Sequence, residues 1–117
     1  MPAMNQDLLQ LHAQLLAQHQ ALYERLDEVT DATAAKIIIT EMQEILHRID
    51  LVEGLLFRQT TGALQESLQK VDAADTELTD ALSSVNAAAD IIAGVSKYLA
   101  VVDQAIDLAK TLGPAAV

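Results

Sequence analysis

The chain has 117 residues, 51% of them hydrophobic, with a formal net charge of −10 at pH 7 and no cysteine. This charge disfavours nucleic acid and anionic membranes, which bind Lys and Arg, and favours a basic protein as partner. Without cysteine, disulfides and thiolate metal sites are excluded. A composition rich in Leu, Ala and Gln, with no proline between Ala3 and Gly113, predicts one all-α domain over residues 1–117.

The first expected helix covers residues 5–29. Asn5 is a favourable cap at a helix start, and Asp7 follows in the first turn, where the helix dipole favours an acid. One apolar stripe repeats every seven residues, at Leu8, Leu15, Leu22 and Val29. Such a stripe predicts an amphipathic helix that buries one side.

A second amphipathic helix is expected over residues 31–60. Its main apolar line comprises Ile38, Met42, Ile45, Ile49, Val52 and Leu56. Other apolar residues, among them Ile39 and Leu46, fall off this line and indicate a central helix with several neighbours. The two stripes are out of phase near Thr30 to Thr33, which predicts a turn with Thr30 or Asp31 as the new cap.

The strongest pattern follows Gly62, where apolar residues recur at intervals of seven. They are Leu64, Val71, Leu78, Val85, Ile92, Leu99 and Ile106. This repeat is typical of helices packed along a seam. It predicts an antiparallel hairpin or bundle, and with Gly62 as the bend, residues 29–35 lie opposite residues 88–94.

Two architectures fit this pattern. One has a single long helix over residues 62–112, which the uninterrupted repeat favours. The other is an up-down-up-down four-helix bundle with a break near residues 84–87, which the weak helix formers between Asp72 and Asn86 favour. We prefer the long helix.

A long last helix leaves an apolar stripe uncovered. The stripe comprises Ile91, Ile92, Val95, Tyr98, Leu99, Val102 and Ile106. Monomers rarely expose so large an apolar surface, so the sequence predicts that a second chain covers it, most simply in a two-fold dimer.

The acidic run Asp72, Asp75, Glu77 and Asp80 contains no base. It is interpreted either as a solvated helix face or as a docking patch for a basic protein. The sequence Glu44-x-x-His47 occurs once, whereas di-iron bundles use this motif twice, so no metal or other cofactor is predicted.

Two histidines lie within the first apolar stripe. His12 and His19 are about 10.5 Å apart along one helix, which is too far to share a metal ion. We expect them at a helix boundary, bonded to a neighbouring helix, with a pH-sensitive interface as the alternative.

No phosphate-binding loop or nucleophile motif is present. The sequence therefore favours a non-enzymatic helical interaction or assembly protein, either a homo-oligomer or an acidic adaptor for a basic protein. The alternatives are a membrane-active protein that uses residues 87–112 and a carrier of an apolar ligand. With no visible signal peptide and no spanning segment, we expect a cytoplasmic location.

Overall fold

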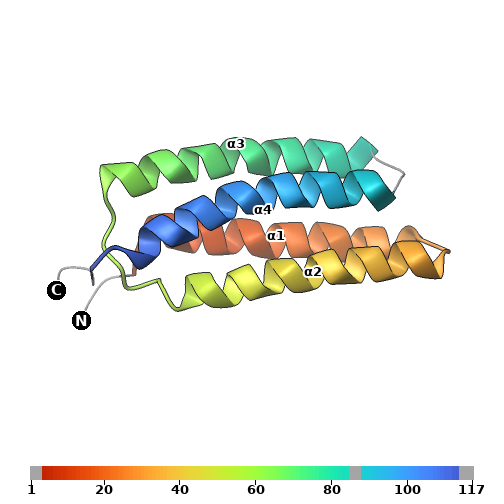
Figure 1. Ribbon diagram of the computed structural model, residues 1–117, viewed down its shortest axis with the longest axis horizontal. Coiled ribbons are helices and arrows are strands. Elements are labelled where there is room, and N and C mark those ends of the chain that lie inside the picture. Colours follow the sequence, from red (N-terminus) through yellow and green to blue (C-terminus); the bar gives the residue numbers. More distant parts are fainter. Residues whose placement is uncertain (1–3, 85–87, 114–117) are drawn as a thin grey trace.

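The computed structural model describes residues 4–84 and 88–113, which form four helices (Figure 1). They are α1 (Gln6–Glu28), α2 (Ala32–Glu53), α3 (Gly62–Ser84) and α4 (Ala88–Lys110). The helices lie side by side along a molecule of 51 × 22 × 17 Å. The predicted all-α bundle is therefore confirmed.

The prediction of one long helix over residues 62–112 is wrong. α3 ends at Ser84 and α4 begins at Ala88, while residues 85–87 lie outside the described residues. A helix over the whole range is about 75 Å long, whereas the longest dimension of the molecule is 51 Å. The seven-residue repeat continues past the break because α3 and α4 each bury one side in the same core. Each helix therefore carries its own apolar stripe.

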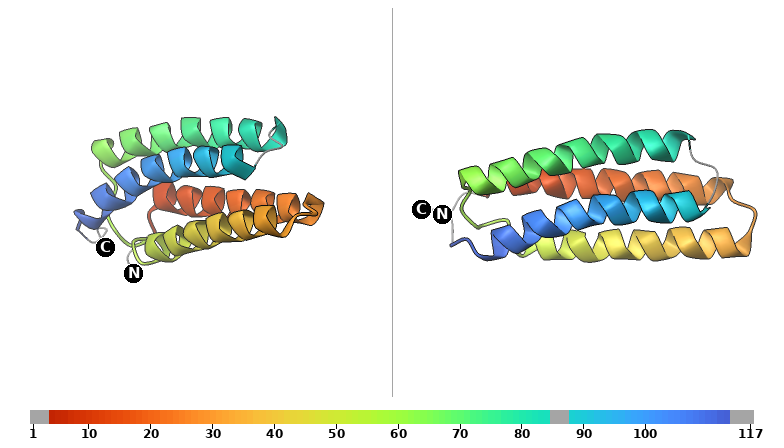
Figure 2. Two further views of the ribbon diagram at one scale, coloured as in Figure 1. Left: turned by 45° about the vertical axis from the view of Figure 1, so that its right-hand side comes forward. Right: turned by 45° about the horizontal axis from the view of Figure 1, so that its top comes forward.

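Two antiparallel hairpins form the two layers of the bundle (Figure 2). α1 packs on α2 in one layer and α3 on α4 in the other, and the layers meet where α1 lies beside α3 and α2 beside α4. The antiparallel pairing predicted across Gly62 is wrong, because α2 and α3 lie on a diagonal without contact. α2 also ends at Glu53 rather than at residue 60, and residues 54–61 cross the end of the bundle.

The predicted proximity of residues 29–35 to residues 88–94 is confirmed, although by a different route. Val29, Ala34 and Ile38 line a hollow together with Ile91 of α4. They meet because the α1–α2 turn and the start of α4 lie at the same end of the bundle (Figure 1).

Polar caps begin the first two helices, as the sequence predicts. Asn5 Oδ1 accepts hydrogen bonds from the backbone N–H groups of Asp7 and Leu8 at 3.0 and 3.2 Å. The Asp31 carboxylate accepts one from the N–H of Thr33 at 3.0 Å. These bonds satisfy N–H groups that have no partner within the helix.

The core lies between the two layers and is mostly aliphatic. Its members from the C-terminal repeat are at most 5% exposed and comprise Leu64, Val71, Leu78, Leu99 and Ile106. Leucines of α1 and isoleucines of α2 close it from the other layer, including Leu8, Leu15, Ile38 and Ile45. Ile92 departs from the pattern, since it is 37% exposed.

Candidate interaction surfaces

The apolar stripe expected to bind a second chain belongs to the bundle's own core. Six of its seven members are at most 5% exposed, namely Ile91, Val95, Tyr98, Leu99, Val102 and Ile106. The seventh, Ile92, borders a hollow of about 240 Å³ next to Ile37 of α2. The break after Ser84 folds α4 back onto the other helices, so they cover the stripe without a second chain.

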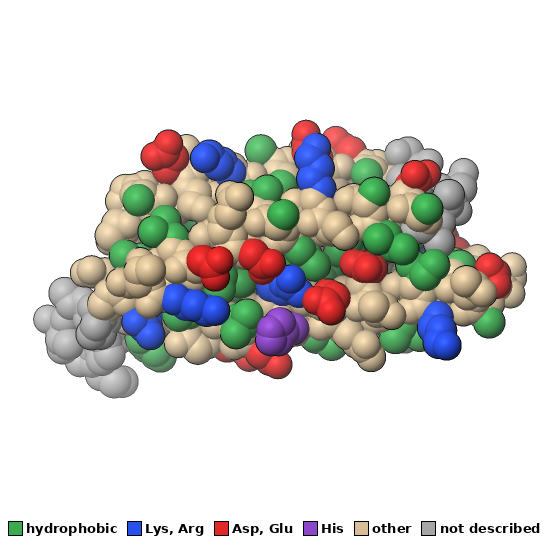
Figure 3. Space-filling model, viewed as in Figure 1, with side chains coloured by type: hydrophobic (Ala, Val, Ile, Leu, Met, Phe, Trp, Pro, Cys, Tyr) green, Lys and Arg blue, Asp and Glu red, His purple; other side chains and the backbone are tan. Residues whose placement is uncertain are grey.

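The four acids predicted as one patch point in different directions. Asp72 and Asp75 accept hydrogen bonds from glutamines of α1, whereas Glu77 Oε2 lies 3.3 Å from Lys97 Nζ of α4. Asp80 is exposed. On the face shown in Figure 3, acidic and basic side chains are likewise interleaved rather than gathered by sign.

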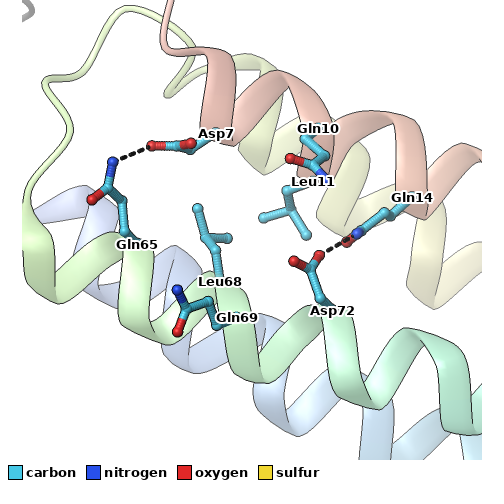
Figure 4. Close-up of a pocket in the computed structure, with 8 residues that line it drawn as sticks. All are labelled: Asp7, Gln10, Leu11, Gln14, Gln65, Leu68, Gln69 and Asp72. Atoms are coloured by element: carbon cyan, nitrogen blue, oxygen red, sulfur yellow. Dashed lines mark hydrogen bonds between the residues drawn. The ribbon is translucent and has the colours of Figure 1, made fainter.

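A polar groove of about 260 Å³ runs along the surface where α1 and α3 meet (Figure 4). Its lining comprises Asp7, Gln10, Leu11, Gln14, Gln65, Leu68, Gln69 and Asp72. The Gln65 amide donates to Asp7 at 3.4 Å, and seven residues further along both helices the Gln14 amide donates to Asp72. The acid thus lies on α1 in the first pair and on α3 in the second, which fixes how far α1 is shifted along α3.

The motif Glu44-x-x-His47 lies on an exposed side of α2. Glu44 pairs with Arg48, as expected from their i,i+4 spacing, and His47 is exposed. The Arg48 guanidinium also donates two hydrogen bonds of 3.0 Å to the Asp103 carboxylate, which joins α2 to α4. These bonds raise the pKa of Arg48 above its usual value. Among the described residues, no group of three potential ligands is placed to hold a metal ion.

A set of hydrogen bonds from one buried side chain continues the contact between α1 and α3. Gln18 is 2% exposed, and its amide donates to Asp75 Oδ1 and to the Thr79 hydroxyl at 2.9 Å each. Neither Gln18 Oε1 nor the Tyr98 hydroxyl has a hydrogen-bond partner among the described residues. Burial raises the pKa of Tyr98, and the carboxylates of Asp75 and Asp72 raise it further. The hydroxyl is therefore uncharged at neutral pH.

The substitution Tyr98→Phe is expected to increase the free energy of unfolding by about 1–2 kcal/mol, because it removes a buried hydroxyl that makes no hydrogen bond. Urea denaturation followed by circular dichroism measures the change. A loss of about 1 kcal/mol, typical of a bonded hydroxyl, would contradict this assignment.

The outer side of the α1–α2 layer carries exposed apolar side chains. Leu16 and Tyr23 of α1 are 47% and 50% exposed, and Ile39 and Leu46 of α2 are 43% and 44% exposed. We call these four residues the outer face. The prediction of a central α2 is wrong, because among the described helices α2 contacts only α1 and α4, and its off-line residues Ile39 and Leu46 are exposed.

One hydrogen bond shows how the outer face is assembled. His12 Nε2 lies 3.0 Å from Glu53 Oε2, at the boundary between α1 and α2 where the sequence places this histidine. Leu16 follows His12 by one turn, and Leu46 precedes Glu53 by two turns, so both lie on the side of this bond. The second apolar residue of each helix lies seven positions further in the same direction. The two helices are joined between Glu28 and Ala32, and at the other end the N–H of Asn5 donates to the Leu56 carbonyl oxygen at 2.7 Å. This antiparallel register places Leu16 near the level of Leu46, and Tyr23 near the level of Ile39.

The sequence contains a signal for this surface. Residues 8–23 of α1 include no Asp, Glu, Lys or Arg, although surface helices usually carry charges on the side away from the core. His19, half-buried, also lies in this stretch. An uncharged stretch of this length in a strongly acidic chain indicates that its outer side is not a simple solvated face.

No protein-family model matches the chain, and neither a curated protein nor a solved structure matches it. Within the described residues, no helix combines the length and the apolar character needed to cross a membrane.

Proposed function

We propose that this chain is a non-enzymatic helical protein that binds another protein through the outer face. The observation that carries the proposal is the exposure of four large apolar side chains, each at least 43% exposed, on one side of the α1–α2 layer. They lie outside a core that is already closed by all four helices. Contiguous apolar surface of this kind commonly marks a protein interface.

The proposal replaces the stripe on α4 as the contact surface. Because most of that stripe is buried within the bundle, a partner has access only to other sides of the molecule. The same observation weighs against a membrane-active role for residues 87–112, since insertion of α4 would first require the bundle to open.

Binding of a basic peptide in the α1–α3 groove is the second candidate function. Asp7 and Asp72 both line this groove, and the net charge of −10 attracts cationic peptides. If this is the binding site, Asp72→Asn weakens binding of an arginine-rich peptide at low salt. Asp31→Asn, at the cap of α2 at the other end of the bundle, leaves this binding unchanged. Equal affinity of the two variants would contradict this candidate.

A site-specific photo-crosslinker tests the outer face. A photoreactive phenylalanine analogue at position 46 is expected to form covalent adducts with a protein in living cells, because this position lies within the outer face. The matched control carries the analogue at Ala73, which is exposed on α3 in the other layer. Equal or absent adducts at the two positions would contradict the proposal.

A further inference from the structure

The outer face also indicates which partner it fits. Resting on the proposed function, we infer that the partner is a second copy of this chain, bound through the same face in a two-fold dimer. Charge, symmetry and area support this choice over a basic protein or a membrane.

Charge argues first for a copy of the chain itself. Two molecules with a charge of −10 repel one another wherever their carboxylates approach. The α1 half of the outer face avoids this repulsion, because residues 8–23 contribute no formal charge. This part of α1 offers no carboxylate to a basic partner, and it offers no Lys or Arg to an anionic membrane. On α2 the acids on this side are Glu53, which already contacts His12, and the exposed Asp50, one turn after Leu46.

The arrangement of the four side chains makes the outer face self-complementary. Each helix supplies two apolar residues seven positions apart, which is about 10.5 Å along the axis. The antiparallel packing sets Leu16 level with Leu46, and Tyr23 level with Ile39. A two-fold axis parallel to the helices keeps these levels and places α1 of one copy over α2 of the other. Leu16 of one copy then lies over Leu46 of the other, and Tyr23 lies over Ile39, as an isologous interface requires.

The area of the layer is sufficient for a stable dimer. α1 and α2 have 23 and 22 residues, so the layer is about 35 Å long and about 20 Å wide. It therefore offers about 700 Å² per copy, close to the roughly 800 Å² per partner of a standard interface.

Sedimentation equilibrium of the full chain at micromolar concentration tests this inference. The expected mass is twice the 12.6 kDa of one chain. Leu46→Glu is expected to raise the dissociation constant at least about 10-fold, because two-fold symmetry places the new charge in the interface twice. Ala73→Glu adds the same charge to the other layer and leaves the dimer intact. Circular dichroism verifies that both variants are folded.

The outcomes separate this inference from the proposed function. A wild-type chain that sediments as a monomer, or equal weakening by both variants, overturns the dimer. In that case, crosslinks from position 46 to a different protein retain the outer face as a binding surface. Crosslinks at position 46 whose peptides come only from this chain support the dimer.

Discussion

Replacement of Leu99 by alanine is expected to lower the free energy of unfolding by about 2–5 kcal/mol. Leu99 is 5% exposed and lies in the core between the two hairpins, so the truncated side chain leaves a cavity that its neighbours fill only in part. Urea denaturation followed by circular dichroism at 222 nm measures the change.

Ile92→Ala is the control, because it also truncates a large aliphatic side chain of α4, at a position outside the outer face. Ile92 is 37% exposed, so we expect a loss below about 1 kcal/mol. If the two substitutions cost the same, Leu99 does not lie in the core and the bundle described here is incorrect.

Asn5→Ala is expected to cost about 2 kcal/mol, more than an ordinary helix cap. The Asn5 side chain caps α1, and its Nδ2 also donates to the Arg58 carbonyl oxygen at 3.1 Å. The residue is 6% exposed. One substitution therefore removes both the helix cap and a bond that ties residues 54–61 to the start of α1.

Two further variants separate these contributions in the same denaturation experiment. Asn5→Asp keeps an acceptor for the cap and loses the donor, so it is expected to lie between the wild type and Asn5→Ala. Asp31→Ala removes an exposed cap alone and is expected to cost about 1 kcal/mol or less. An Asn5→Ala loss no larger than that of Asp31→Ala would contradict the tertiary role of Asn5.

Local chemistry made much of the fold predictable. Asn5 and Asp31 cap helices because their short side chains reach the first free N–H groups, and this depends only on nearby residues. The apolar repeat likewise identifies core positions such as Val71 and Leu99, because a helix presents every seventh residue on nearly the same side.

The candidate surface was not predictable in the same way. Leu46 and Leu99 are both leucines at helical spacing, yet one is exposed and the other is buried. A seven-residue repeat shows which side of a helix is apolar, but several helices can cover that side. The number of neighbours around each helix depends on contacts between residues far apart in the sequence.

By itself, the sequence determined the helical class, the first two caps and the seam that forms the core, since these follow from short-range periodicity and hydrogen bonding. Only the tertiary structure decided that the chain breaks after Ser84 and that α3 packs beside α1 instead of α2. The break folds α4 onto the bundle and buries the expected interface. Each helix of the bundle has two neighbours, so the apolar residues Ile39 and Leu46 on the remaining side of α2 stay exposed.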